Sequence, residues 1–209
     1  MKKHLHKFLK SKIWLISALV ALGFVVIGGV ICYFLVQRSG VVDPKDSAAL
    51  ITEARKLAKD GKNTEAIADY EKALEVDTTN NTVKVELANL YMKQKEYDSA
   101  AAELSEVTAA NPSDSYALNS LGNSLRNQGK TAEAIDTYKK AIAGGNSDSV
   151  VNLVTLYNIS GDYADSITLL NSELLKTPDD PILLQVLAST YSKKGDSKKA
   201  AEILAKIKK

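Results

Sequence analysis

A spacing of small and bulky side chains recurs through most of the chain. A glycine or lysine is followed five residues later by a small residue, and four residues after that by a bulky one. The pattern occurs at Gly61-Ala66-Tyr70, Lys95-Ala100-Leu104, Gly129-Ala134-Tyr138, Gly161-Ser166-Leu170 and Gly195-Ala200-Leu204. Units of this length cannot bury a core singly, so they must stack against one another. The pattern therefore predicts a repeat architecture.

Each unit is predicted to contain two helices. Apolar residues before the turn recur at helical spacing, as Leu118, Leu121 and Leu125 do. The small residue after the turn, such as Ala134, allows two antiparallel helices to approach closely, and a larger side chain there would cost about 1–3 kcal/mol. We place the units at 47–80, 81–114, 115–146, 147–180 and 181–209, the third being two residues shorter around Gly144-Gly145.

These residues resemble the tetratricopeptide repeat family. The third unit carries Leu121-Gly122, Leu125, Gly129, Ala134, Tyr138 and Ala141, and the second carries Leu87-Ala88, Tyr91, Ala100, Leu104 and Pro112. The resemblance covers residues 47–209 and implies an all-α fold, a right-handed α-solenoid of about five helix-turn-helix repeats. Four positions depart from the family pattern. Glu53 and Lys84 occupy apolar slots, and Ser166 and Glu173 replace alanines.

The resemblance also implies a protein-binding groove, because first helices line the concave face in this family. The inward positions that carry over are mostly amide and basic: Arg55, Asn89, Lys93, Tyr116, Asn119, Asn123, Arg126, Asn127 and Asn158. Amides can bind a peptide backbone, and Arg or Lys can bind its acidic groups. The alternative is a merely solvated surface, where such residues are common. The clamp with which some family members grip a C-terminal carboxylate is incomplete here.

The N-terminal region is predicted to anchor the chain in a membrane. Residues 13–36 carry no charge, and at about 1.5 Å per residue they span about 36 Å, enough for a ~30 Å hydrocarbon core. Residues 1–12 form a basic tail with five lysines, and residues 37–46 form a polar linker. Because positive charge favours the cytoplasmic side, we expect a single-pass protein of the cell membrane with a cytoplasmic N-terminus and extracytoplasmic repeats.

Composition argues against several other classes of function. Outside the tail the chain is slightly acidic, so no nucleic-acid partner is expected. The two histidines, His4 and His6, lie in the tail, and the single cysteine, Cys32, lies in the apolar stretch. Gly129-Lys130-Thr131 resembles the end of a phosphate loop, but Ser124 stands where that loop needs a glycine. We predict no enzyme, cofactor or metal site.

The sequence therefore predicts a membrane-anchored scaffold that binds protein or peptide partners through its concave groove. We expect it on the extracytoplasmic side of a bacterial membrane, in envelope assembly, secretion or chaperoning. The alternative is a cytosol-facing receptor on an organelle membrane, similar to the mitochondrial import receptors built from these repeats. The sequence leaves the partner and the oligomeric state open.

Overall fold

The structure is a computed structural model that describes residues 44–207. This part of the chain forms ten α-helices. They are α2 (Pro44–Lys59), α3 (Asn63–Val76), α4 (Asn81–Gln94), α5 (Tyr97–Ala110), α6 (Ser115–Asn127), α7 (Thr131–Ala143), α8 (Asp148–Ser160), α9 (Tyr163–Leu174), α10 (Pro181–Lys194) and α11 (Ser197–Ile207). Consecutive helices form five helix-turn-helix pairs, beginning with α2 and α3. The predicted all-α array of about five repeats is thereby confirmed.

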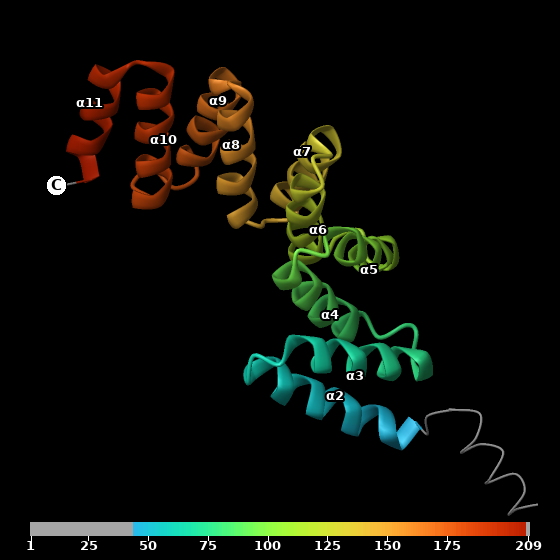
Figure 1. Ribbon diagram of the computed structural model, residues 1–209. Coiled ribbons are helices and arrows are strands. Elements are labelled where there is room, and N and C mark those ends of the chain that lie inside the picture. The colour runs from blue at the N-terminus through green and yellow to red at the C-terminus, as the bar shows by residue number, and fades with distance from the viewer. Residues whose placement is uncertain (1–43, 208–209) are drawn as a thin grey trace, which may run out of the picture.

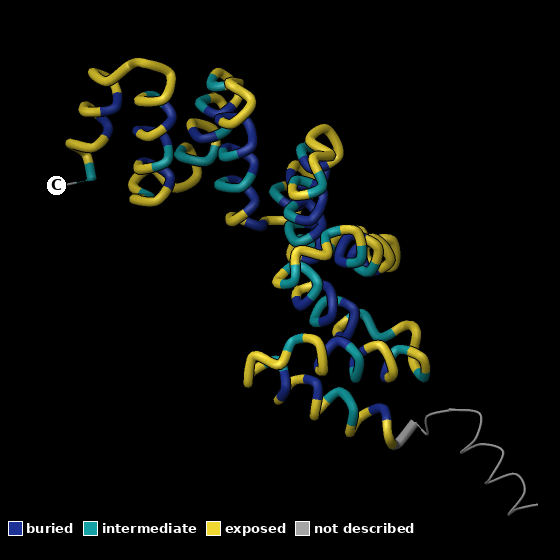
Figure 2. Tube along the Cα trace, in the orientation of Figure 1, coloured by how far each residue is buried: buried dark blue, intermediate teal, exposed yellow. Residues whose placement is uncertain are grey.

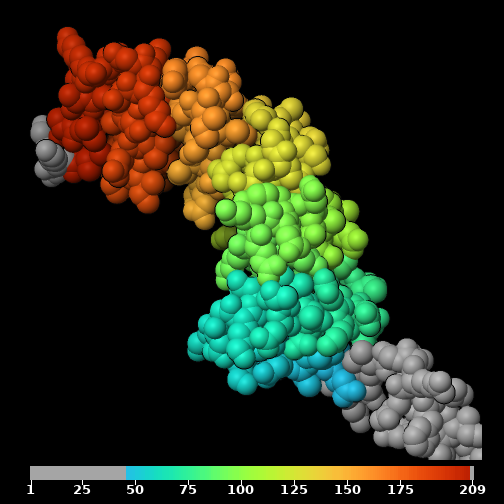
Figure 3. All heavy atoms as spheres, in the orientation of Figure 1, coloured from blue at the N-terminus to red at the C-terminus, as the bar shows by residue number. Residues whose placement is uncertain are grey.

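The five pairs stack side by side into a curved array, with α2 at one end and α11 at the other (Figure 1). From the second pair onward, the first helices of successive pairs touch one another: α4 contacts α6, α6 contacts α8 and α8 contacts α10. Around the bend, α4 and α6 lie on the inner side and α5 and α7 on the outer side (Figure 1). The space-filling view shows the molecule bending around this open inner side (Figure 3).

A buried stripe runs through the whole array (Figure 2). Ala66, Ala100 and Ala134 are each 0% exposed where the two helices of a pair cross. In the third pair the crossing is so close that a Cβ added to Gly122 would come within 2.6 Å of Cε1 of Tyr138. The small residues recognised in the sequence therefore have the predicted role of allowing close helix packing.

Polar residues begin the first helices at regular intervals. Asn80, Asp114 and Asp180 precede α4, α6 and α10, and each side chain accepts hydrogen bonds from backbone N–H groups of the first turn. Asn146 does the same before α8, since its Oδ1 accepts from the Ser149 backbone N–H at 2.9 Å. These caps satisfy donors that a helix start leaves unpaired, which favours helix initiation at the same register in each repeat.

The turn within each pair requires a residue with positive φ. Glycine fills this position in four pairs, but Lys95 fills it in the second, with φ of 66°. Lys95 is the only non-glycine residue with positive φ among residues 44–207. The sequence pattern, which allows a lysine in place of the glycine, therefore located this turn correctly. Because lysine has a Cβ, its positive φ strains the backbone there.

Three of the four departures from the family pattern have separate structural explanations. Glu53 is exposed in α2, where its carboxylate pairs with Lys56. Lys84 is buried, and its ammonium group pairs with Glu106 of α5. Ser166 is 0% exposed, but its hydroxyl donates to Asn158 Oδ1 at 2.9 Å, so the buried hydroxyl has a partner. These contacts let polar residues occupy slots that the pattern reserves for apolar or small ones.

The predicted N-terminal segments are for the most part not described by the structure. The basic tail (1–12), the membrane span (13–36) and residues 37–43 of the predicted linker lie outside the described residues. Within 44–207, no helix combines the length and hydrophobicity that a membrane span requires. Helix α2 begins at Pro44, so the end of the predicted linker is helical, because proline is tolerated in the first turn of a helix.

Candidate protein-binding face

Several inner-face side chains join one repeat to the next. Arg55 of α2 forms a two-pronged ion pair with Glu86 of α4, with N–O distances of 2.9 Å from Nε and 2.8 Å from Nη2. Tyr70 also donates to Glu86, at 2.5 Å. Burial alone would raise the pKa of Glu86, but the hydrogen bonds from Arg55 and Tyr70 outweigh it, and the pKa is lowered. Arg55, predicted to bind a partner, is therefore occupied in holding the first two repeats together.

Asn119 plays a similar part between the third and fourth repeats. Its Oδ1 accepts a hydrogen bond from the Ser149 hydroxyl at 2.8 Å and another from Asn152 Nδ2 at 2.9 Å. The same Ser149 hydroxyl lies 2.9 Å from Oδ1 of the cap residue Asn146. Asn119 was predicted as a groove residue, but its side-chain oxygen stabilises the contact between α6 and α8.

Asn158 is buried, which corrects its prediction as an accessible groove residue. Its Nδ2 donates to Thr190 Oγ1 of α10 at 2.9 Å, and its Oδ1 accepts from Ser166 of α9. A buried amide with partners on both sides holds the fourth and fifth repeats together. The sequence did not reveal the burial of Asn158. The register of a helix predicts which side chains point inward, but it does not show whether a neighbouring helix covers them.

Asn123 is also less available than predicted. Its Oδ1 accepts a hydrogen bond from the Tyr138 hydroxyl at 2.8 Å, and its backbone carbonyl accepts one from Asn127 Nδ2 at 2.8 Å. Burial raises the pKa of Tyr138 to about 12, and the positive charge of Arg126 acts in the opposite direction. The amide nitrogen of Asn123 remains the part of its side chain that is free to donate, within the part of the chain that the structure describes.

The junction between α4 and α6 differs from the others. No hydrogen bond or ion pair links side chains of these two helices among residues 44–207. Asn89 and Lys93 of α4 are exposed, Tyr116 of α6 is 76% exposed, and Arg126 is half-buried. None of these four side chains has a hydrogen-bonding or ionic partner within the described residues. This junction therefore presents amide, phenol and cationic groups to the solvent.

Two exposed apolar residues belong to the same face and were missed. Ile182 is 62% exposed and follows its cap residue Asp180 at the same distance as Tyr116 follows Asp114. Ile159 is 73% exposed and lies two residues before the turn residue Gly161, as Lys93 lies two before Lys95. The sequence signal for both residues is this register, which they share with predicted groove residues although their side chains are apolar.

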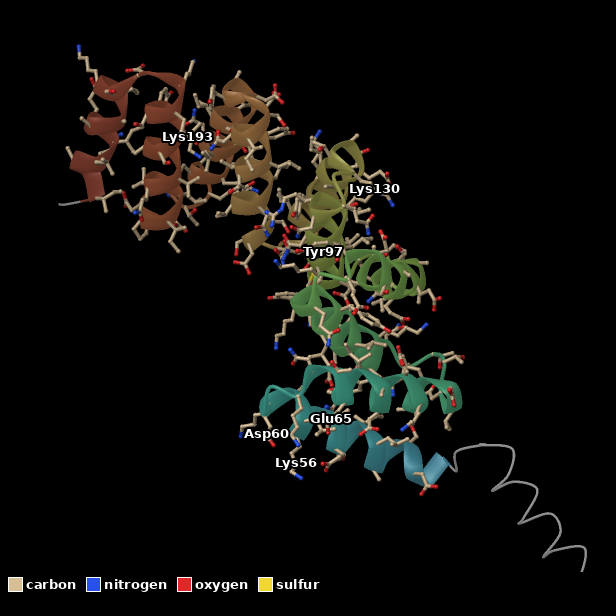
Figure 4. All side chains as sticks on the ribbon, viewed as in Figure 1. Lys56, Asp60, Glu65, Tyr97, Lys130 and Lys193 are labelled. Carbon is tan, nitrogen blue, oxygen red and sulfur yellow. The ribbon has the colours of Figure 1, made fainter. Side chains whose placement is uncertain are left out.

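Two open pockets lie on the surface of the array. The larger one, about 740 Å³, is lined by residues of α9, α10 and α11, including Leu174, Leu184 and Ile203. The neighbouring Leu175 is 85% exposed. A further pocket of about 420 Å³ lies at the turns of the second and third repeats, near Tyr97 and Lys130, which Figure 4 labels. Residues 44–207 contain no cluster of three or more His, Cys, Asp or Glu side chains placed to hold a metal ion.

Known proteins support the repeat assignment. Two family models described as the tetratricopeptide repeat match residues 54–80 and 85–149. A comparison with curated proteins gave no match.

Solved structures share the fold. MamA is 21% identical, with a TM-score of 0.67, and the alignment covers 77% of this chain and 89% of MamA. A tetratricopeptide repeat protein from Parabacteroides merdae is 23% identical, with a TM-score of 0.67, covering 88% of this chain and 74% of that one. YrrB, described as a TPR protein with an unusual peptide-binding site, is 20% identical, with a TM-score of 0.59, covering 76% of this chain and 82% of YrrB.

The matched models account for three of the five helix pairs in whole or in part, and the solved structures share the curved array of such pairs. This family consists of protein-binding scaffolds that are typically not enzymes. Taken with the repeating caps, turns and small crossing residues, these matches establish that the chain is a tetratricopeptide repeat protein.

Proposed function

We propose that this chain is a membrane-anchored scaffold that recruits partner proteins through the inner face of its repeats, centred on the junction between α4 and α6. The observation that carries the proposal is the difference between junctions. The side chains of Arg55, Asn119 and Asn158 form hydrogen bonds with the neighbouring repeat. The α4–α6 junction keeps its own groups exposed, and a binding surface needs such unpaired groups.

The chemistry of this junction suits a peptide segment. Asn89 can both donate to and accept from a peptide backbone, and Lys93 and Arg126 can bind carboxylates. Tyr116 offers a large rigid surface with a polar tip, a side chain that is enriched at protein interfaces. The description of YrrB as having a peptide-binding site, on a similar fold, supports the same kind of ligand.

The test is site-specific photo-crosslinking of the full-length protein in native membranes. A photo-reactive amino acid at Asn89 should capture defined partners, and the same probe at Lys140, exposed on outer helix α7, should not. The double substitution Lys93→Glu with Arg126→Glu should reduce capture, whereas the matched outer substitution Lys130→Glu with Lys140→Glu should leave it unchanged. Equal capture from both faces would contradict the proposed site. Circular dichroism of each variant separates loss of binding from loss of fold.

The membrane location rests on the apolar segment 13–36 and the five lysines before it. Protease added to intact spheroplasts should degrade the repeats if they are extracytoplasmic. Full protection of the repeats would instead support the cytosol-facing receptor. Release of the protein by alkaline carbonate, without detergent, would contradict anchoring in either orientation.

A further inference from the structure

The last turns of the first helices carry a row of side chains at nearly the same register. Lys59, Lys93 and Lys193 each lie two residues before the positive-φ turn residue of their repeat. In the third repeat Asn127 holds that position, and the long side chain of Arg126 starts one residue earlier on the helix. In the fourth repeat the position is taken by Ile159, which is 73% exposed. In Figure 4 Lys193 lies on α10, towards the opposite end of the array from the labelled Lys56 and Asp60. We call Lys59, Lys93, Arg126, Ile159 and Lys193 the last-turn row.

The cations of this row are not used within the described structure. Lys59, Lys93 and Lys193 are exposed, and none of the four cations forms an ion pair among residues 44–207. Lysine in the last turn also stabilises a helix through its dipole. That effect needs a charge somewhere in the last turn, and α2 has a second one in Lys56 and α10 has one in Lys194. Helix stability therefore does not require the shared register.

The spacing of the row selects a ligand conformation. First helices in contact, as α4, α6 and α8 are, pack with axes about 8–10 Å apart. A polyproline II segment has three residues per turn and rises about 3.1 Å per residue, so every third side chain lies on one side about 9 Å further along. A β-strand would turn alternate side chains away, since its side-chain period is two. Of these two extended conformations, the threefold one matches one ligand side chain to each repeat.

We propose that the last-turn row binds an acidic partner segment in the polyproline II conformation, with carboxylates at three positions spaced by three and an apolar residue three further on. The carboxylates lie against Lys59, Lys93 and Arg126, and the apolar side chain lies against Ile159. This inference rests on the proposed function, because it specifies the chemistry of the same inner face. Charge complementarity identifies the occupant, and the single apolar position in the row sets its register.

The test measures binding of synthetic peptides to the full-length protein in detergent, by fluorescence anisotropy. The spaced peptides EPPEPPEPPL and LPPEPPEPPE cover both chain directions. At least one should bind about tenfold more tightly than EEEPPPPPPL, which has the same composition with contiguous charges, and should weaken with added salt. Lys59→Glu or Ile159→Ser should reduce this preference, and Lys140→Glu, on the outer side, should not. Equal affinity for spaced and contiguous peptides would overturn the proposal.

The two proposals fail in distinguishable ways. If no peptide binds but the probe at Asn89 still captures a partner, the inner face is the binding site and the acidic, threefold ligand is wrong. If the spaced peptide binds with equal affinity to the wild type and to Lys59→Glu, the peptide binds elsewhere and the row is not its site. If neither peptide nor partner is captured from the inner face, both proposals fall.

Discussion

The phenolic hydroxyl of Tyr138 donates a hydrogen bond to Oδ1 of Asn123 at 2.8 Å, which ties the second helix of the third repeat to a residue of the inner face. Tyr138 is 0% exposed, whereas Asn123 is half-buried. The orientation of one inner-face side chain is therefore set by the core directly beneath it. Preorganisation of this kind lowers the entropy that a binding surface loses when a partner docks.

Removal of this hydroxyl is expected to destabilise the fold modestly. Tyr138→Phe should lower the free energy of unfolding by about 1 kcal/mol, the usual net contribution of one hydrogen bond. Urea denaturation followed by circular dichroism measures the change. Tyr163→Phe is the control, because that half-buried hydroxyl has no partner within the described residues. Equal stability of the two variants would mean that the Tyr138 bond contributes nothing.

Gly122→Ala is expected to destabilise the third repeat. The added Cβ would lie 2.6 Å from Cε1 of Tyr138, so the ring or the helix must move. Overpacking costs about 1–3 kcal/mol, and the better helix propensity of alanine returns about 1 kcal/mol, which leaves a net loss of about 0–2 kcal/mol. Ser120→Ala is the control, because Ser120 is half-buried on the same helix and its hydroxyl has no protein partner within the described residues; it should show no loss. A more stable Gly122→Ala variant would show that the crossing is not tightly packed.

Lys95→Gly is expected to stabilise the protein. Lys95 has a φ of 66°, which costs a residue with a Cβ about 1–2 kcal/mol. Glycine avoids this cost but loses about 0.5–1 kcal/mol more conformational entropy on folding, so the net gain should be about 0.5–1 kcal/mol. The matched control is Lys130→Gly. Lys130 has a φ of −79°, so this substitution relieves no strain and only the entropic cost of glycine remains. If the unfolding temperatures of both variants shift in the same direction, the backbone at Lys95 is not strained.

The ion pair at the first junction should make stability depend on pH. Although burial raises it, the pKa of Glu86 is lowered overall from its ordinary value of 4.5 by the hydrogen bonds from Arg55 and Tyr70. Its contribution is therefore fully present above pH 4.5 and is lost as the pH falls through the lowered pKa of the folded state. Glu86→Gln should be less stable than the wild type at pH 7, and the difference should shrink towards pH 3. A difference that is constant with pH would show that the charge of Glu86 is not responsible.

The buried amide of Asn158 should be required for joining the last two repeats. Asn158→Ala removes the amide partner of the Ser166 and Thr190 hydroxyl groups. Each hydroxyl keeps a backbone carbonyl partner, so each lost hydrogen bond should cost about 0.5–1.5 kcal/mol. The double substitution Asn158→Ala with Ser166→Ala should cost less than the sum of the two single ones, because they share one contact. Strict additivity in urea denaturation would show that the two side chains act independently.

Some features of this protein could be read directly from its sequence because they depend on local spacing. The five turns within the helix pairs, including the one at Lys95, follow from residues at fixed intervals, as do the small residues Ala66, Ala100 and Ala134. Each requirement arises within one helix pair, so neighbouring residues suffice to reveal it. The spacing therefore predicted the helix pairs and the all-α array.

Which inner-face side chains stay accessible was decided by tertiary structure alone. Register placed Arg55, Asn119 and Asn158 on the inner face together with Asn89 and Lys93, but it could not show which of them contact the next repeat. Hydrogen bonds across a junction join residues about thirty positions apart, as Arg55 and Glu86 are, and depend on how two repeats stack. The sequence determined which side chains face inward, and only the stacking of the helices decided that those at the α4–α6 junction remain free to bind.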